Sequence, residues 1–408
     1  MQYDYLIVGS GIIGMTIAYE LLNEDSLLTI AIIDKEDDVA KHASGRNSGV
    51  LHAGFYYTAN SLKAKFTVDG NRLMKKFCNE NNIFVKNTQK IVVAKDEKEL
   101  EGIYELQKRA EINGVDTKVI GEEEVLKIDS NIKTYKKALF SPNTASVDPK
   151  EVCYKLRDIL KEKSVDFFFN TSFEDCNLEY KYLINSAGAY ADKIAQKFGL
   201  AKNYTMLPFK GIYLKYMTNK TDIKTNIYPV PNLANPFLGV HYTITNDGSI
   251  KIGPTAIPAF WRENYKGFSN FNFKEMIEII YFETKLFIQN SFNFRKLAIE
   301  EMKNYSSKVF IQKAKDMVKN IGNDFKPIPA GIRAQLLNTK TNELVQDFVI
   351  ERGKNSIHIL NAVSPAFTCS VAFAKYVVDG IKQNKKEDTD VKEVRKCKSF
   401  SNRCCWIY

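Results

Sequence analysis

The stretch Tyr5-Leu6-Ile7-Val8-Gly9-Ser10-Gly11-Ile12-Ile13-Gly14, near the start of a 408-residue chain, determines the fold class. Four consecutive apolar residues are typical of a strand buried on both faces of a parallel sheet. The spacing Gly9-x-Gly11-x-x-Gly14 follows at once, and a helical pattern continues to about Leu22. A second apolar run, Thr29 to Ile33, ends on Asp34, about twenty residues beyond the turn. This β-α-β order predicts a dinucleotide-binding unit of the Rossmann type.

Each glycine of the turn has a separate physical task. Gly9 permits the tight turn, Gly11 lets the backbone approach a pyrophosphate, and Gly14 lets helix and strand pack closely. The helix N-terminus presents free N–H groups to the phosphates. Asp34 is placed to accept hydrogen bonds from a ribose. The predicted cofactor contacts in this unit are Gly9, Gly11, Ile13, Gly14, Asp34 and Lys35.

The choice among dinucleotides follows from what accompanies the turn. Asp34 has no adjacent arginine, which argues against NADP. A single fingerprint, with no C-x-x-C among seven cysteines, disfavours a disulfide reductase with two nucleotides. The glycine-rich stretch Ser44 to Gly54 suits FAD, because small residues permit close approach to the ribityl chain and the ring. FAD is therefore the predicted cofactor, with loop contacts from Ser44, Asn47, Ser48 and Gly49.

The rest of the chain alternates between Rossmann-like stretches and segments of a different pattern. We expect an α/β fold in which a Rossmann-type FAD-binding domain carries an inserted α+β substrate domain with a mostly antiparallel sheet. The expected boundaries are 1–85, 140–205 and 325–382 for the first domain and 86–139 and 206–324 for the second. Residues 383–408 are charged and polar, and we expect a disordered tail there.

The amino-acid composition limits the classes of binding partner that we expect. A hydrophobic content of 44% with 26% charged residues is typical of a globular enzyme. The net charge of +10 is compatible with an anionic substrate, an anionic membrane or nucleic acid, but no stretch alternates aromatics with arginines, so no nucleic acid is expected. No Cys/His spacing indicates a metal site. No run approaches the ~18 apolar residues of a membrane span, and the chain enters a strand directly. We expect a cytoplasmic protein, with a peripheral contact at the inner face of the membrane left open.

Several longer motifs carry a family resemblance. The segment 47–57, Asn-Ser-Gly-Val-Leu-His-Ala-Gly-Phe-Tyr-Tyr, followed by Ser61-Leu62-Lys63-Ala64-Lys65, resembles the L-2-hydroxyglutarate dehydrogenases and oxidases, which are D-amino-acid-oxidase-like flavoenzymes. Later segments resemble the same family in the same order: 226–231 with 237–241, 248–254, 329–335 and 361–366. The resemblance runs from about residue 3 to 382. The departures are Asp34, where glutamate is commoner, and Lys210, where the family often has arginine.

The resemblance implies oxidation of L-2-hydroxyglutarate to 2-oxoglutarate, with electrons passing to FAD and then to quinone or another acceptor. It also implies a second FAD-contacting turn at residues 185–189, in which Ala187 and Gly188 touch the cofactor. Ser364, Pro365 and Ala366 open the closing helix, whose positive end is expected to face the flavin.

Oxidation of a hydroxy acid needs a group that takes the hydroxyl proton. The chain has four histidines, of which His52 lies in the glycine-rich loop and His241 ends an apolar strand. We expect His241 to be the base and His52 to orient the substrate or the flavin. His42 is expected at the surface and His358 in the core.

A dicarboxylate substrate also needs cationic anchors, and arginine binds carboxylates in a fork geometry. Arg333 stands among small and apolar residues, an unusual place for a solvated arginine, and is the predicted anchor in the catalytic site. Lys63 and Lys210 are further candidates for substrate binding. Tyr56, with Tyr57, is expected to hydrogen-bond the substrate or to wall its pocket.

Two alternatives remain open at this level. The chain could be a related flavoenzyme acting on glycerol-3-phosphate or an amino acid. It could also be a membrane-docked flavin-binding protein with little turnover, which the basic charge and an aromatic stretch suggest. We expect these aromatics mainly in the core: Phe260, Trp261, Phe268, Phe271 and Phe273.

Overall fold

A mostly parallel six-stranded sheet carries the glycine-rich turn in the computed structural model, which describes residues 2–59, 61–218, 223–231 and 239–401. In spatial order its strands are β17 (Val349–Gly353), β18 (Ser356–Asn361), β9 (Glu179–Asn185), β1 (Gln2–Val8), β2 (Ile30–Ile33) and β8 (Asp166–Phe168). All neighbours pair in parallel except β17 and β18. The predicted β-α-β unit is confirmed.

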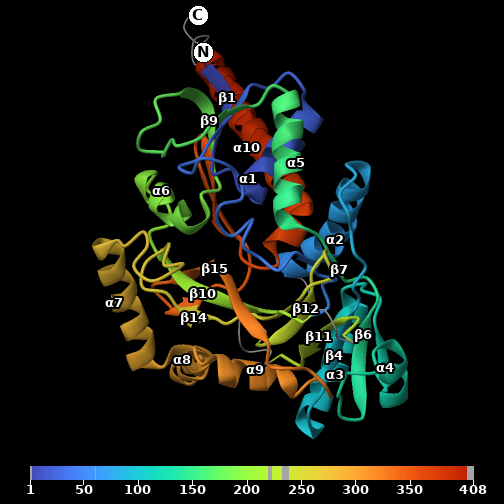
Figure 1. Ribbon diagram of the computed structural model, residues 1–408. Coiled ribbons are helices and arrows are strands. Elements are labelled where there is room, and N and C mark those ends of the chain that lie inside the picture. The colour runs from blue at the N-terminus through green and yellow to red at the C-terminus, as the bar shows by residue number, and fades with distance from the viewer. Residues whose placement is uncertain (1, 60, 219–222, 232–238, 402–408) are drawn as a thin grey trace, which may run out of the picture.

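Helices cover both faces of this sheet (Figure 1). One face packs on the largest apolar core together with α1 (Ile12–Glu24), α2 (Leu62–Glu80), α5 (Pro149–Glu162) and α10 (Ala366–Ser401). The other face packs on α6 (Ala191–Lys197) and nearby loops. Polar caps set the helix starts: the Ser61 side chain accepts from Ala64 N at 3.1 Å, and Asp148 accepts from Lys150 N at 2.8 Å before Pro149.

A ten-stranded sheet forms the second layer, below the first in Figure 1. Its pairs are antiparallel except that of β11 with β4. In spatial order it contains β16 (Glu343–Leu344), β15 (Phe325–Asn338), β10 (Tyr204–Tyr216), β13 (Ile250–Gly253), β12 (His241–Ile244), β11 (Asn226–Pro229), β4 (Lys90–Val93), β6 (Lys137–Ser141) and β5 (Lys118–Gly121), with β14 (Ile257–Pro258) on β10. The expected mostly antiparallel sheet is therefore present.

Shorter elements complete the layers. Helices α7, α8 and α9 follow one another along the lower rim of the molecule, and α3 and α4 flank β5 and β6 (Figure 1). Strands β3 (Val50–Leu51) and β7 (Ala145–Ser146) form a small separate pair. The remaining bounds are α3 (Glu97–Ile112), α4 (Glu122–Ile128), η1 (Gly188–Tyr190), α7 (Phe273–Gln289), η2 (Ser291–Asn293), α8 (Phe294–Lys303) and α9 (Ser307–Lys315).

The structure corrects one expected domain boundary. We placed residues from 325 onward in the FAD-binding domain, but β15 pairs along its whole length with β10 in the ten-stranded sheet. The cause is the 14-residue strand itself, which is long enough to pair with β10 from Tyr204 to Tyr216 across one bulge. The nucleotide-binding layer resumes only at β17.

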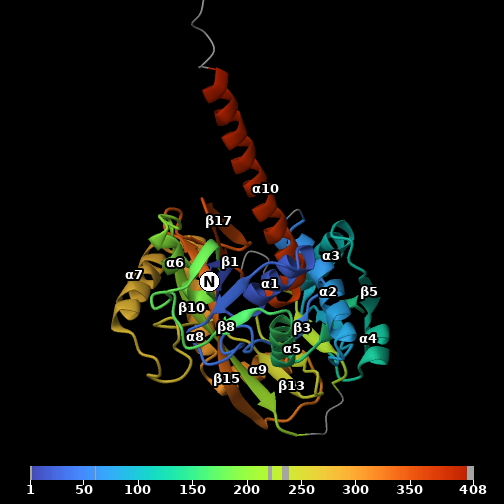
Figure 2. The ribbon, with the colours of Figure 1, turned by 90° about the horizontal axis from the view of Figure 1, so that it is seen from above.

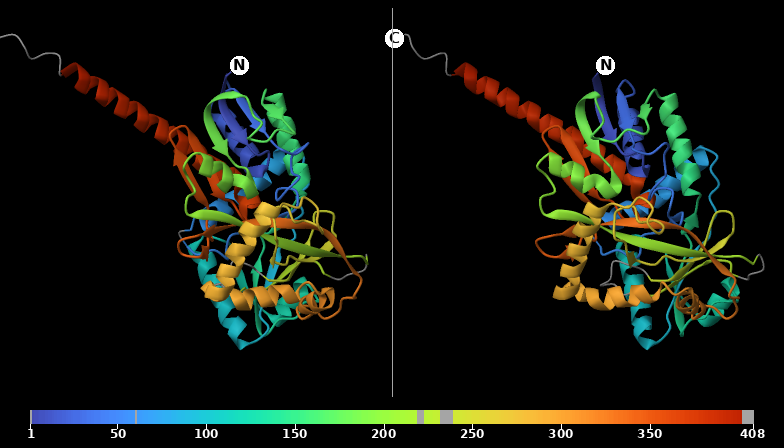
Figure 3. Two further views of the ribbon diagram at one scale, coloured as in Figure 1. Left: turned by 90° about the vertical axis from the view of Figure 1, so that its left-hand side faces the viewer. Right: turned by 60° about the vertical axis from the view of Figure 1, so that its left-hand side comes forward.

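The expected disordered tail is also corrected in part. Helix α10 runs to Ser401 and projects from the body as a rod (Figures 2 and 3), while residues 402–408 lie outside the described part. No glycine or proline follows Gly380, so nothing in the sequence breaks the helix. Among the described helices, none combines the length and apolarity that a membrane crossing needs.

The aromatic stretch is not core, contrary to expectation. Only Trp261 is buried, whereas the other four side chains are exposed: Phe260, Phe268, Phe271 and Phe273. Trp261 holds this surface together, since its ring meets Phe271 edge-on at 5.2 Å between centroids.

Candidate functional site

A cavity of about 540 Å³ lies between the two layers. One wall comes from the nucleotide-binding layer: the glycine-rich turn, the 42–52 loop, the turn after β9 and the first turn of α10. The opposite wall comes from β10 and β15 through Gly211, Tyr213, Gly331 and Arg333. Thirteen of the fifteen predicted cofactor contacts line this cavity: Gly9, Gly11, Ile13, Asp34, Lys35, Ser44, Asn47, Ser48, Ala187, Gly188, Ser364, Pro365 and Ala366.

The glycine-rich turn has the geometry of a phosphate cradle. Gly9 has a φ of +101°, and a Cβ on it would lie 2.6 Å from the Ser186 carbonyl oxygen. A Cβ on Gly11 would lie 3.0 Å from Ser44 Oγ, in the space at the start of α1. Ser44 Oγ accepts from Ile12 N at 2.9 Å, and the first-turn amides have no partner within the helix. An anion thus finds backbone donors and the positive end of α1.

The two remaining predicted contacts, Gly14 and Gly49, are absent from the lining. A Cβ on Gly14 would lie 2.2 Å from the Gly9 carbonyl oxygen, and one on Gly49 would lie 2.2 Å from that of Val147. They let the wall pack closely.

Asp34 is fixed in the cavity wall at the end of β2. Its Oδ2 accepts from Ser10 N at 2.7 Å and from Ser10 Oγ at 2.6 Å, and its Oδ1 accepts from Glu36 N at 3.0 Å. A carboxylate has about four lone-pair sites, so acceptor capacity remains for ribose hydroxyls. The cavity size, the glycine cradle and this acid all fit FAD.

The far end of the cavity is closed by the 42–52 loop and α10. Thr368 Oγ1 accepts from His52 N and donates to the Val50 carbonyl oxygen, both at 3.2 Å. Ser364, Pro365 and Ala366 therefore stand next to the loop, and the first turn of α10 lines the cavity with its positive end.

Both predicted catalytic histidines are buried beside this end. His52 lines the cavity, and its Nδ1 lies 3.4 Å from Lys90 Nζ. His241 is stacked on Tyr228 with 3.7 Å between ring centroids, and its Nδ1 lies 2.9 Å from the Gly239 carbonyl oxygen. Burial, then Lys90, lowers the pKa of His52 well below its usual value and that of His241 to about 3. Both rings are neutral near pH 7.

Arg333 on β15 faces the cavity from the second layer. In the sheet, Arg333 pairs with Phe209 of β10. Its side chain donates a hydrogen bond to Tyr213, which also contacts Ser48. Its charge acts on His241 and Lys63, lowering the pKa of each. Arg333 is thus within electrostatic reach of both the predicted base and the second anchor.

Lys63 and Tyr56 lie near this group but outside the lining residues. Burial lowers the pKa of Lys63 to about 8, while Asp347, which accepts from Lys63 N at 3.0 Å, opposes that change. Tyr56 packs between Phe55 and Tyr228, and its hydroxyl has no partner among the residues described.

Lys210 is placed elsewhere. Its Nζ donates to Asn264 Oδ1 at 3.1 Å, and it is not among the lining residues, although Gly211 is. Successive residues of a strand point to opposite faces, which explains the separation. The geometry does not support the predicted contact of Lys210 with substrate.

The sequence reasoning missed Lys90, Tyr213 and Tyr228. Lys90 is fully buried at the start of β4, where it belongs to a run of buried residues, Lys90-Ile91-Val92-Val93. A lysine in a strand buried on both faces was the available signal. His358 is structural, as predicted, with ring contacts to Asn185 and Ser356 at 3.0 Å.

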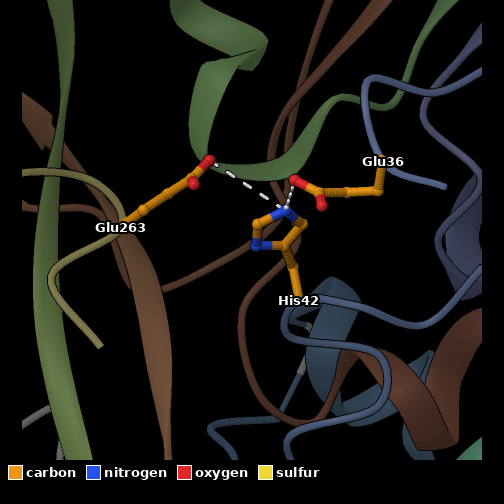
Figure 4. A group of neighbouring side chains, drawn as sticks. All are labelled: Glu36, His42 and Glu263. Carbon is orange, nitrogen blue, oxygen red and sulfur yellow. Dashed lines mark hydrogen bonds and ion pairs between the residues drawn. The ribbon is translucent and has the colours of Figure 1, made fainter. Parts of the chain in front are cut away.

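Next to the cavity, which Lys35 and His42 line, charged side chains join the two layers (Figure 4). His42 Nε2 lies 2.9 Å from Glu36 Oε1 and 4.0 Å from Glu263 Oε1, and its Nδ1 lies 2.7 Å from the Tyr265 hydroxyl. His42 is thus half-buried in a network, where the sequence predicted a surface position. The three ligand atoms lie within 4.8 Å of one another, as in a metal site. Lys35, however, pairs with both carboxylates, so a cation of the chain itself already contacts the two acids of this group.

Arg262 strengthens the same connection. Its guanidinium forms a bidentate pair with Asp192 on α6, at 2.5 and 2.8 Å, and also donates to the Ala189 carbonyl oxygen. Both side chains are at most 1% exposed. The segment after β14 is thereby fixed against the nucleotide-binding layer.

Comparisons with known proteins agree with this geometry. The profile of the family described as DAO, FAD dependent oxidoreductase, matches residues 4–380. The chain is 32% identical to the L-2-hydroxyglutarate dehydrogenase of Escherichia coli (strain K12) over 399 residues, covering 93% of each chain. It is 33% identical to the mitochondrial L-2-hydroxyglutarate dehydrogenase of Homo sapiens, covering 94% of this chain and 89% of that one. Among solved structures, the FAD-bound L-α-glycerophosphate oxidase of Mycoplasma pneumoniae has a TM-score of 0.72 at 21% identity, over 93% and 94% of the two chains.

Proposed function

Because the chain belongs to the DAO family of FAD-dependent oxidoreductases, we propose that it oxidises L-2-hydroxyglutarate to 2-oxoglutarate. The identity of 32–33% over 93–94% of this chain to proteins named L-2-hydroxyglutarate dehydrogenase supports this choice of substrate. The structural observation that carries the proposal is a cluster of basic side chains, of which Arg333 and His52 line the cavity. The buried Lys90 and His241 and the half-buried Lys63 lie near them, outside the lining, and both histidines are neutral. Two carboxylates need such an excess of positive charge.

The residues divide the task as follows. Bound FAD supplies the acceptor for the hydride that leaves C2 of the substrate. His241, neutral at pH 7, takes the proton of the hydroxyl, while His52 orients the substrate from the flavin side. Arg333 binds one carboxylate and Lys63 lies near enough to balance the other. The positive end of α10 stabilises negative charge at the cofactor.

Anaerobic mixing of the yellow holoenzyme with substrates tests the assignment. L-2-Hydroxyglutarate should bleach the flavin absorbance, and glycerol-3-phosphate and L-amino acids should not. Bleaching by glycerol-3-phosphate or an amino acid alone would assign the enzyme to a neighbouring activity of the superfamily. Bleaching by none of them would leave a flavin-binding protein with little turnover.

We further propose that α7 contacts an anionic membrane, where a quinone takes the electrons. Six apolar side chains of α7 are exposed, and at 100° per residue they fall within a stripe about 120° wide: Phe273, Ile277, Ile280, Tyr281, Phe287 and Ile288. The opposite face buries Ile279 and Leu286, so α7 is apolar on both sides. Lys274 and Lys285 fall at one edge of the stripe, as suits anionic headgroups.

Sedimentation with phosphatidylglycerol vesicles tests this contact. The double variant Ile277→Asp/Ile280→Asp should lose vesicle binding and vesicle-dependent quinone reduction, while anaerobic flavin reduction is unchanged. Ile112→Asp is the matched control, since Ile112 is 61% exposed on α3, away from the stripe. Unaltered sedimentation of the double variant would contradict the proposal, and a dimer in vesicle-free solution would assign the stripe to a second copy of the chain.

A further inference from the structure

Lys90 is a buried lysine of the cluster to which the division of catalytic roles above gives no individual task. Its side chain has 0% exposure, and Nζ lies over the rings of Tyr228 at 4.0 Å, Tyr56 at 5.1 Å and Phe55 at 5.7 Å. No carboxylate oxygen of the described residues lies within ion-pair distance of Nζ. A buried ammonium without a carboxylate is costly unless its surroundings use it.

The atom that Lys90 Nζ approaches is Nδ1 of His52, at 3.4 Å. An ammonium has three N–H donors and no acceptor. Burial lowers the pKa of Lys90 to about 7, so the ammonium form predominates only below neutral pH, and in that form the contact requires a lone pair on His52 Nδ1. The proton of the neutral ring is then on Nε2. His52 Nε2 can donate a hydrogen bond, but it cannot take a proton without becoming an imidazolium beside Lys90.

His241 has the opposite arrangement. Its Nδ1 lies 2.9 Å from the Gly239 carbonyl oxygen, which can only accept. The proton of this ring is therefore on Nδ1, and Nε2 carries the lone pair. Stacking on Tyr228, whose ring is also the nearest of those under Lys90 Nζ, fixes the plane of the imidazole. At Nε2, His52 therefore presents a hydrogen-bond donor and His241 presents an acceptor.

We propose that Lys90 is a positioning residue that fixes the Nε2–H tautomer of His52 and so makes His52 a hydrogen-bond donor to the substrate. His241 is then the only histidine at this end that can take the hydroxyl proton. This division of roles rests on the proposed oxidation, but the tautomer assignment itself does not. The charge of Lys90 also opposes protonation of both rings, which keeps the base available in mildly acidic solution.

The tautomers can be measured without substrate. In holoenzyme labelled with ¹⁵N-histidine, the ring nitrogen shifts should show His52 protonated on Nε2 and His241 on Nδ1, with peaks assigned through His52→Asn and His241→Asn. In Lys90→Met, which removes charge and donor at similar length, His52 should lose its single tautomer and begin to protonate at a higher pH. A His52 ring protonated on Nδ1 in the unmodified protein would overturn the proposal, whatever the enzyme oxidises.

The kinetic consequence is measured by anaerobic flavin reduction across pH. Lys90→Met should reduce flavin about 10- to 100-fold more slowly, the effect of about 1.5–3 kcal/mol for one hydrogen bond to a charged group. The acid limb of the rate profile should move to higher pH. Lys251→Met, which removes a half-buried lysine from β13 in the same sheet, should change neither. A Lys90→Met enzyme with a wild-type rate and pH profile per bound flavin would show that Lys90 is only structural. Failure of wild type to be reduced would instead contradict the proposed function.

Discussion

Arg333 lines the cavity from the second layer and is the proposed anchor for a substrate carboxylate. Arg333→Ala should lower kcat/KM for L-2-hydroxyglutarate by the equivalent of about 3–5 kcal/mol, because a carboxylate would remain buried without its partner. Steady-state and anaerobic kinetics measure the loss.

The matched variant is Arg333→Lys. It keeps the charge but not the fork geometry, so it should recover only part of the activity. Complete recovery would mean that charge alone is required, and an unchanged Arg333→Ala enzyme would place the carboxylates elsewhere.

For single residues, the sequence predicted those roles that depend on nearby residues in the chain. Gly9, Gly11 and Asp34 could be assigned because their tasks depend on neighbours within one β-α-β unit. Lys90 could not, since its approach to His52, 38 positions away, depends on how β4 enters the large sheet. The role of Lys210 stays a prediction, since its side chain donates to Asn264 and the sequence could not show which face of β10 it would occupy.

Among the elements, the start of α1 has the most direct consequence for the cofactor. Gly11→Val should yield a colourless apoprotein, because a Cβ already comes within 3.0 Å of Ser44 Oγ in the phosphate cradle. The flavin-to-protein absorbance ratio of the purified protein measures this.

Gly121→Val provides the control. Gly121 is the N-cap of α4 with a φ of −83°, close to the −72° of Gly11, and the nearest atom to an added Cβ is Lys137 Nζ at 3.9 Å. This variant should stay yellow. Full flavin occupancy in Gly11→Val would remove the basis for the cofactor assignment.

Most elements were predictable because apolar periodicity and capping residues are local signals. Ser61 caps α2, Leu62–Glu80, and Asp148 with Pro149 begins α5, Pro149–Glu162, both with residues typical of helix starts. The length of α10 and the sheet to which β15 belongs could not be predicted. The length of α10 depends on the absence of tertiary contacts along its projecting part, and the place of β15 depends on its pairing with β10.

For the whole molecule, the buried Arg262–Asp192 pair connects the layers. Asp192→Asn should reduce the free energy of unfolding by about 3–5 kcal/mol, since a buried guanidinium loses its counter-charge. Urea denaturation at a fixed, saturating FAD concentration measures it.

The adjacent Lys193 supplies the comparison. It pairs with Glu278 at 2.8 Å, but the two side chains are 40% and 29% exposed. Lys193→Ala should cost only about 0–1 kcal/mol. Equal effects of the two variants would mean that the Arg262–Asp192 pair is no more important than a surface contact.

The network of Lys35, Glu36, His42 and Glu263 bears on the order of assembly. These side chains come from two layers and pair beside the cavity, which Lys35 and His42 line. A cofactor held between the layers is expected to be in place before these pairs form, so loading belongs to the final stage of folding. Once closed, the holoenzyme should retain FAD through extensive dilution, and release should require the layers to separate. The flavin would then be installed once and kept for the lifetime of the chain.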